Sequence, residues 1–369
     1  MTDGKAISIE LRRELENAWE IKVPDLFWNF LTREPSQSLP DIDIFTVEEM
    51  IMESERTVRL PPNLRLFGKY SSGDSYICFH TVNGQNANKY EVVCWNIEER
   101  CLIPCASNFV NFLCKHLYST RYNLDEEGEH DIDVKYWSGL FNSLEVEAAW
   151  VFDEIPMNEK MMYETMSQHD RGDCLSQCHL GCILRSRGQV DEATHHFNEA
   201  SKYTPWFGDA YYLLADVFRV EDSIEKAFHE WWKILNLPVV YSTRSDSWDL
   251  GADYPDADIY ELTVDLMLGV QKSIPSTITD TPLWNAFLLE DPYDPVMREK
   301  LAETYSELGM HSAAESELWN AYFLYADDEY DELVRINSKL ITLLDIQRRT
   351  YDVKQLKREQ NRLLKHHEQ

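Results

Sequence analysis

Hydrophobic residues in the first third of the chain recur first with a helical and then with a strand spacing. Apolar positions three or four residues apart predict an amphipathic helix over 7–19, and Pro24 opens a second, shorter helix. The stretch DIDIFT at 41–46 alternates polar and apolar residues, which predicts a half-buried strand, and VEEMIMES after it predicts one or two helical turns. YEVVCWN at 90–96 predicts another strand, and Ser107 is expected to cap a helix.

A glycine-bearing turn lies between the two apolar halves of LRLFGKYSSGDSYICFHTV. A phosphate-binding loop needs converging backbone N–H groups and the start of a helix after them. Here a β-branched and aromatic run follows Gly73 and Asp74, so the chain leaves the turn as a strand. Gly73 adopts positive φ without steric cost, and the serines and Asp74 can bond the nearby backbone. The stretch therefore predicts a β-hairpin, and residues 1–120 predict an α+β domain in which helices pack on an antiparallel sheet.

Four segments of this domain resemble the Smi/Knr family of the SUKH superfamily. In order they are LENAWEIKVPDLFWNFL, IDIFTVEEM, LPPNLRLFGKYSSGDSYICF and IPCASNFVNFL, and the resemblance covers about residues 7–117. The motif positions are Phe67, Gly68, Gly73, Asp74, Tyr76, Phe79, Ile103, Phe109 and Phe112. The chain has TREPSQS where many members have an Asn-Gly-Gly turn. The resemblance implies a fold that brings no catalytic residues. In bacteria the superfamily is associated with immunity proteins that bind and neutralise toxins, and many of these toxins are nucleases. In fungi it is associated with cell-wall regulation.

The rest of the chain predicts helices with an internal period. Residues 174–207 resemble a 34-residue tetratricopeptide repeat, through Leu180, Gly181, Leu184, Gly188, Ala193, Phe197, Ala200 and Pro205. Similar patterns occur at 208–241 and 295–328, and LWNAFLLEDPYD recurs as LWNAYFLYADDEYD, which indicates a degenerate unit before 295. An all-α solenoid is therefore expected over 174–330.

Four regions follow from these patterns. The α+β domain of residues 1–120 precedes an acidic linker with connecting helices at 121–173. The predicted repeats at 174–330 contain an acidic insertion at 242–259. Residues 331–369 are expected to form a capping helix and a basic tail.

The net charge of −30 excludes several partner classes. Sixty-five acidic residues against 35 Lys and Arg repel phosphate backbones and anionic lipid headgroups, so neither nucleic acid nor a membrane is expected as a partner. Two interpretations remain open: attraction of a basic protein, or simple solubility. Without an apolar span or a visible signal, a cytoplasmic location is expected.

The eight cysteines predict reduced thiols rather than a disulfide framework. Cys174, Cys178 and Cys182 share one helix face, where a metal site and a row of small residues are the alternatives. His179 projects from another side and no fourth ligand is placed nearby, so neither a metal nor another cofactor is expected. Asp173 is expected to cap this helix.

Groove positions of the predicted repeats supply the candidate partner-binding residues. They are Asp209, Tyr212, Asp216, Arg219, Glu299 and Glu303. On a concave solenoid surface these acidic groups would steer a basic protein, whereas solvated charge without a function is the alternative.

Two functions are open at this stage, and neither is enzymatic, because no nucleophile, metal cluster or phosphate loop is indicated. One is an intracellular immunity protein that binds and neutralises a basic toxin, such as a nuclease. The other is a tetratricopeptide scaffold or regulator that holds a host peptide. Positions 5 and 9 of the repeats lack the Lys and Asn of a chaperone-binding clamp. The sequence does not indicate an oligomeric state.

Overall fold

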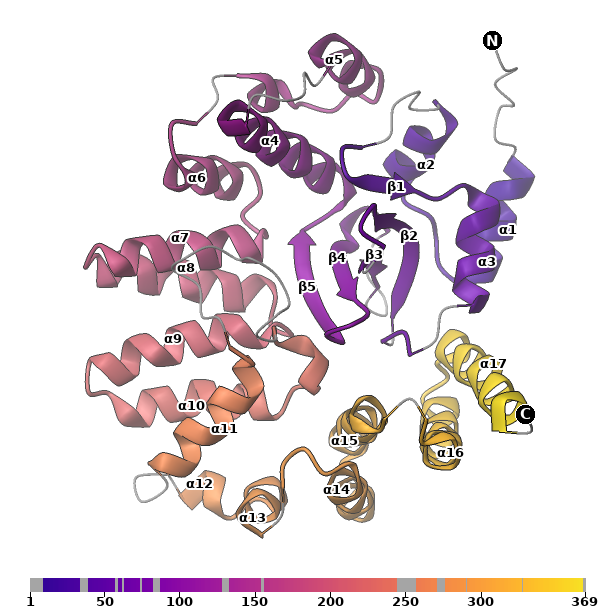
Figure 1. Cartoon of the computed structure of the whole chain (residues 1–369), viewed down its shortest axis with the longest axis vertical. Coiled ribbons are helices and arrows are strands. Elements are labelled where there is room, and N and C mark those ends of the chain that lie inside the picture. The colour runs from indigo at the N-terminus through magenta and orange to yellow at the C-terminus, as the bar shows by residue number, and fades with distance from the viewer. Residues whose placement is uncertain are drawn as a thin grey trace. The chain divides into compact units, whose positions relative to one another are not determined.

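The chain divides into two compact units. The computed structural model describes residues 9–33, 39–56, 59–61, 63–73, 75–81, 87–127, 133–153, 156–243, 257–270, 276–289, 291–326 and 328–367. Unit 1 comprises Met1–Arg56, Asn63–Glu98 and Ile103–Pro205. Unit 2 comprises Thr57–Pro62, Glu99–Leu102 and Trp206–Gln369. Figure 1 labels the elements of both.

A five-stranded sheet forms in the amino-terminal part, with its strands in chain order. The strands are β1 Ile42–Ile44, β2 Leu64–Tyr70, β3 Ser75–His80, β4 Glu91–Asn96 and β5 Cys101–Ala106. β1 pairs antiparallel with β2, β2 with β3, and β3 with β4. The predicted antiparallel sheet is confirmed, although β5 had not been predicted.

The hairpin predicted between β2 and β3 is confirmed, and two glycines shape this part of the sheet. Gly73 has a φ of +88° and its N–H donates to the carbonyl of Tyr70 at 2.9 Å. Gly68 lies at a register shift of β2, where an added Cβ would come within 2.9 Å of the carbonyl oxygen of Asp43. The turn therefore reverses the chain, as its sequence indicates, although Asp74 lies outside the described residues.

Helices α2 (Asp25–Thr32) and α4 (Phe109–Glu127) pack their aromatic side chains against β2 and β3. Phe27 of α2 lies 5.2 Å from Phe67 and 5.0 Å from Phe79, measured between ring centroids. Phe109 of α4 lies 4.8 Å from Phe27. All four rings are buried, so this cluster forms the core of the α+β part.

Unit 1 contains further helices, before and after α4 in the chain. They are α1 Ile9–Trp19, α3 Val47–Arg56, η1 Ala87–Lys89, α5 Val134–Ser143, η2 Ala149–Phe152, α6 Glu159–His169, α7 Cys174–Ser186 and α8 Val190–Tyr203. α4 packs against η2 and α6, and α7 packs against α8. Asp173 accepts a hydrogen bond from the N–H of Ser176, which confirms the predicted cap of α7.

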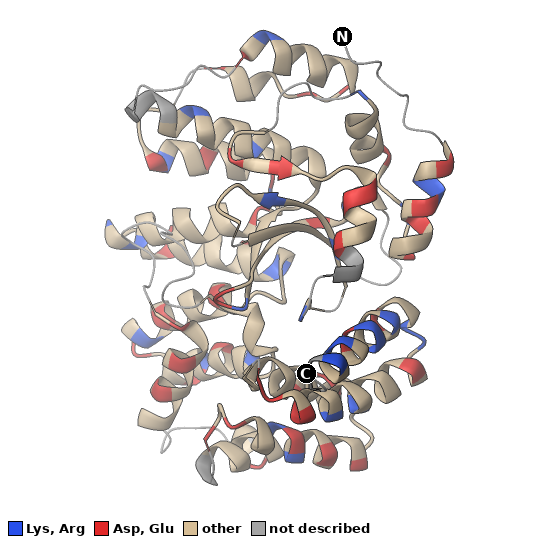
Figure 2. Cartoon of the chain, turned by 45° about the vertical axis from the view of Figure 1, so that its right-hand side comes forward, with Lys and Arg blue, Asp and Glu red and all other residues tan. Residues whose placement is uncertain are grey.

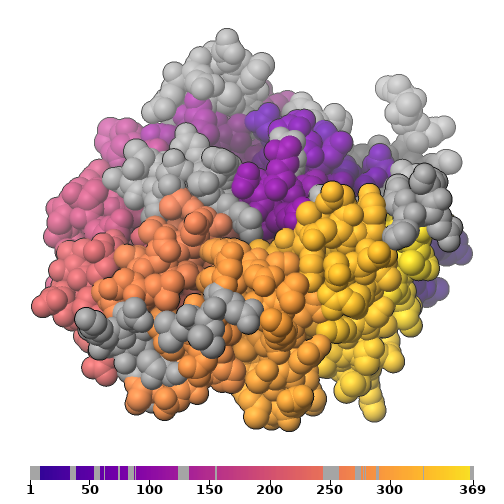
Figure 3. Space-filling model, turned by 60° about the horizontal axis from the view of Figure 1, so that its bottom comes forward, coloured from indigo at the N-terminus to yellow at the C-terminus, as the bar shows by residue number. Residues whose placement is uncertain are grey.

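Unit 2 consists mainly of helices. They are α9 Gly208–Val220, α10 Ile224–Leu235, η3 Val239–Tyr241, α11 Ile259–Gly269, α12 Ser276–Thr279, α13 Pro282–Leu289, α14 Pro295–Glu307, α15 His311–Leu324, α16 Tyr330–Ile346 and α17 Thr350–His367. α9 pairs with α10, α14 with α15, and α16 with α17. The orange and yellow parts of Figure 3 show the packed surface of the later helices. The carboxy-terminal part is thus rich in helices, as predicted.

Unit 2 also contains the two short segments that carry Arg59 and Arg100. Arg59 donates to the carbonyl oxygens of Tyr325 at 2.9 Å and Ala326 at 3.1 Å. Arg100 donates to the carbonyl oxygen of Phe323 at 2.9 Å. These carbonyls lie at the carboxyl end of α15, where unpaired acceptors and the helix dipole favour a cation. The pattern of the sequence assigns both segments to the α+β domain and does not indicate this role.

The structure corrects three local predictions. The boundary at residue 120 falls inside α4, which continues to Glu127. Asn108 rather than Ser107 caps α4, since its side chain accepts from the N–H of Asn111. The expected basic tail is helix α17, which packs against α16. Most of the insertion predicted at 242–259 lies outside the described residues.

Candidate functional site

The six predicted partner-binding residues lie on two helices of unit 2 and differ in exposure. Four lie on α9 and two on α14. Asp209 is fully buried, and its carboxylate accepts from the N–H of Thr243 at 2.9 Å and from the hydroxyl of the same residue. The prediction that Asp209 contributes to an exposed acidic surface is therefore wrong. Its carboxylate instead fixes the chain that follows η3, because a buried carboxylate needs hydrogen-bond donors.

The other three residues on α9 offer little free charge. Tyr212 is buried, with 7% of its surface exposed. Asp216 and Arg219 form an ion pair of 2.6 Å one helical turn apart. Their opposite charges cancel locally, so this part of the helix presents a polar rather than an acidic surface.

Glu299 on α14 is also buried, and cations neutralise it. The hydroxyl of Tyr325 donates to its carboxylate at 2.7 Å, Lys339 donates at 2.9 Å, and Arg335 donates to both oxygens. Burial alone would raise the pKa of Glu299, but these hydrogen bonds outweigh burial and lower the pKa. The prediction that Glu299 lies on an exposed surface is therefore wrong. Its charge instead connects α14 with α16.

Glu303 is exposed, but it shares Lys339 with Glu299 through a contact of 2.8 Å. The repeat register correctly indicates that Glu299 and Glu303 lie on one helix face. It does not indicate that α16 supplies two cations to that face. The predicted acidic groove is therefore mostly neutralised by neighbouring side chains.

An exposed acidic strip that the sequence analysis missed lies in unit 1. We define the acidic strip as Asp41, Asp43, Glu48 and Glu49, which are all exposed. The strip runs from edge strand β1 into the first turn of α3, and no Lys or Arg occurs between residues 39 and 53. Lys69 is the residue paired with Asp43 on the neighbouring strand.

Local structure holds the helical part of the strip in place. The Glu49 carboxylate accepts from the N–H of Thr46 at 2.8 Å, and the Thr46 hydroxyl accepts from the N–H of Glu49 at 3.2 Å. This reciprocal capping favours acidic residues at the start of α3. The spacing of DIDI and the following EE is the sequence signal from which the strip could have been predicted.

A hollow of about 280 Å³ lies beside the aromatic core of unit 1. Its wall combines apolar side chains of α2, β3 and the first turn of α4 with two asparagines, and it is lined by Pro24, Leu26, Phe79, Ala87, Tyr90, Asn108, Phe109, Val110 and Asn111. The amide groups of Asn108 and Asn111 both donate to the hydroxyl of Ser107, at 3.3 and 3.0 Å. These polar groups are thus occupied in shaping the start of α4.

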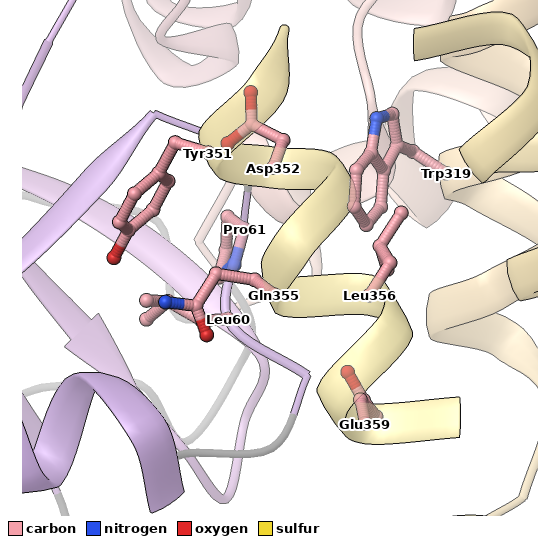
Figure 4. Close-up of a pocket in the computed structure, with 8 residues that line it drawn as sticks. All are labelled: Leu60, Pro61, Trp319, Tyr351, Asp352, Gln355, Leu356 and Glu359. Atoms are coloured by element: carbon pink, nitrogen blue, oxygen red, sulfur yellow. The ribbon is translucent and has the colours of Figure 1, made fainter. Parts of the chain in front are cut away.

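A smaller cavity in unit 2 holds about 20 Å³ (Figure 4). Trp319 of α15, Leu356 of α17 and Pro61 are among its lining residues. The volume fits about one water molecule. It is too small for a metabolite.

A buried polar cluster in unit 1 is the nearest arrangement to a catalytic constellation. The ammonium group of Lys115 lies 2.6 Å from a carboxylate oxygen of Asp173, and Asp170 accepts from the N–H and hydroxyl of Ser107 at 3.0 and 2.6 Å. Burial, followed by the charge of Asp173, raises the pKa of Asp170. Neither of the two cavities described above is lined by these residues. The cluster connects α4 to the turn between α6 and α7, which is a structural role.

Cys78, Cys105 and Cys114 lie in buried environments that raise the pKa of the thiol and so suppress thiolate formation. All eight cysteines are buried. Burial raises the pKa of Cys105 and of Cys114 to about 12. Cys174, Cys178 and Cys182 are at most 1% exposed, and every residue of α7 from Cys174 to Leu184 is buried, so this part of the helix is enclosed on all sides. Within the described part of the chain, no three Cys, His, Asp or Glu side chains gather as metal ligands, and no helix there is long and apolar enough to cross a membrane.

Comparison with known proteins gives no family. Neither a protein-family model nor a curated protein matches the chain significantly. The function is therefore inferred from the fold, the charge distribution and the sequence motifs.

Proposed function

We propose that the protein is a non-catalytic binding protein that acts inside cells as an immunity protein and neutralises a basic toxin, for which a nuclease is one candidate. The observation that carries the binding proposal is the acidic strip. Four exposed carboxylates follow each other on an edge strand and a helix start, in a segment without cations. Such a surface accelerates the encounter with a basic protein and favours contact with its Lys and Arg side chains.

The immunity role is supported by the order of the elements. The SUKH resemblance implies a helix that ends in a proline, then a loop and a strand, a hairpin and a closing helix, and α1, β1, the β2–β3 hairpin and α4 occur in that order. Phe67, Phe79 and Phe109, three of the motif positions, meet in the aromatic core. These positions support the resemblance as fold determinants, while the strip would supply the recognition.

Affinity capture from the source cells, followed by mass spectrometry, identifies the partner to be used in the test. A toxin gene directly upstream of this gene would support the same assignment. We expect the captured partner to be basic and its affinity to fall as salt increases, because salt screens exposed charges.

Charge-reversal variants then locate the binding surface. We expect Asp43→Lys with Glu48→Lys to weaken binding roughly tenfold or more, since opposite charges in the contact become like charges. The matched control is Glu221→Lys, directly after α9, with Glu225→Lys on α10, which changes the net charge equally at exposed positions. Equal affinity of the strip variant and the wild type would remove the strip from the mechanism, and a captured acidic partner would contradict the proposal.

A scaffold that holds a host peptide is the second candidate function. Its support is the helix pattern, since α7, α9 and α14 begin at Cys174, Gly208 and Pro295, where the predicted repeats begin. If the repeats bind the peptide, the double variant Asp216→Lys with Glu303→Lys should weaken peptide binding. A partner that responds to this pair and not to the strip variant favours the scaffold.

A further inference from the structure

The last helix, α17, exposes positive charge in a chain that is otherwise strongly acidic. Lys354, Lys357, Arg358 and Lys365 are exposed, and Arg362 is half-buried. At about 100° per residue these positions fall on one side of the helix. Figure 2 shows the Lys and Arg colouring along this helix. We call these five residues the cationic face.

The acidic residues of α17 point away from this face. Glu359 is 6% exposed and accepts from the N–H of Arg59 at 3.1 Å. Asp352 is 7% exposed and accepts from Arg349 at 2.8 Å. Leu356 and Leu363 are buried on the same inner side. Packing against the rest of unit 2 thus buries both carboxylates, while four of the five cations of the face are exposed to solvent.

We propose that the cationic face is a docking surface for a short acidic segment of another protein. The face spans about 17 Å from Lys354 to Lys365, at about 1.5 Å per residue. An acidic helix of three turns, or an extended stretch of about five residues, matches this length. Leu364, 46% exposed at the border of the face, offers an apolar contact to such a segment.

The negative charge of the rest of the chain favours a short acidic segment over a larger polyanion as the partner of the cationic face. Residues 348–369 contain seven Lys or Arg and three Asp or Glu, a net charge of +4, so the rest of the chain carries −34. A nucleic acid or an anionic membrane extends beyond one helix face and would meet this negative field. A second copy of the chain is excluded as a stable partner, because one helix face is much smaller than the roughly 800 Å² per partner of a stable interface. Only a short acidic segment stays within the positive surface.

The test measures binding of the full chain to a labelled 12-residue peptide with five Glu and one Leu, by fluorescence anisotropy at about 50 mM salt, where the Debye length is over 10 Å. A peptide with Gln in place of every Glu is the ligand control. We expect the acidic peptide to bind, the Gln peptide to bind at least tenfold more weakly, and Lys357→Glu with Arg358→Glu to reduce the affinity roughly tenfold or more.

The matched control variant is Lys89→Glu with Lys135→Glu, which makes the same change of net charge at two exposed lysines of unit 1. Retained affinity in this control supports the proposal. An equal loss in both variants would show that only net charge matters and would overturn it. Absence of peptide binding up to millimolar concentration would also overturn it, as would tighter binding to a thymidine oligonucleotide of equal charge or to vesicles with anionic lipid. Circular dichroism of each variant checks that the helices remain.

Discussion

Among single residues, His179 shows how strongly the environment changes a side chain. Its ring stacks on Tyr163, with a centroid distance of 4.5 Å and an interplanar angle of 2°, and only 7% of its surface is exposed. Burial, with a smaller contribution from the charge of Lys115, lowers the pKa of His179 to about 3. The sequence shows that His179 leaves the cysteine face of its helix, but not that the imidazole is held neutral.

This shift predicts a pH dependence of stability. The unfolded imidazole has a pKa of about 6.5, so between pH 6.5 and about 3 the unfolded state binds a proton that the folded state does not. The free energy of unfolding therefore falls as the pH falls through this window. When the pH is lowered from 7 to 4.5, the free energy of unfolding should fall by about 2 kcal/mol less in His179→Gln than in the wild type. Urea denaturation at the two pH values measures this difference. His195→Gln, at an exposed histidine, is the control, and an unchanged pH dependence in His179→Gln would contradict the assignment.

Among the elements, the α7–α8 pair depends on a glycine. A Cβ added at Gly181 would lie 2.3 Å from the ring of Phe197 on α8, which is fully buried. The sequence motif correctly indicates that a small residue faces a large one across this helix pair. The ring cannot withdraw easily, because it is enclosed in the packed interior.

Gly181→Ala should therefore destabilise the protein by about 1–3 kcal/mol through overpacking. Gly139→Ala is the matched control, because Gly139 lies in the interior of α5, and among the described residues no atom beyond its chain neighbours and its own helix backbone comes within 4 Å of the added Cβ. There we expect a gain of up to about 1 kcal/mol, since alanine favours the helix. Thermal denaturation measures the change in stability of both variants. Equal changes in stability would mean that Phe197 does not restrict the residue at position 181.

For the whole molecule, the division of the chain differs from the one that the sequence indicates. The sequence predicts a domain that ends at residue 120, whereas unit 1 extends to Pro205. Contacts of Asp170 and Asp173 with Ser107 and Lys115 connect α4 with the chain before α7. These residues are distant in sequence, so no local pattern indicates that they meet.

A fragment of residues 1–205 should consequently be more stable than one of residues 1–120. Cutting at 120 shortens α4 and removes both carboxylates together with η2 and α6, which pack against α4; the lost burial should cost at least about 2 kcal/mol. Urea denaturation of the two fragments measures the difference. In the longer fragment, Asp170→Asn with Asp173→Asn should reproduce part of that loss of stability, because it weakens the same contacts. Equal stability of the two fragments would favour the boundary near residue 120.

The sequence by itself determined the periodic and local features. Alternation placed β1, the stretch YEVVCWN placed β4, and glycine placed the hairpin turn. The repeated 34-residue pattern placed the starts of α7, α9 and α14. These features depend on the order of residues along the chain. Tertiary structure decided which charges are exposed. Asp209 and Glu299 occupy helix positions that the repeat pattern predicted to face a groove, yet Thr243, Arg335 and Lys339 surround their carboxylates. A periodic pattern gives the direction of a side chain on its own helix, whereas its charge state and exposure depend on groups that distant segments bring to it.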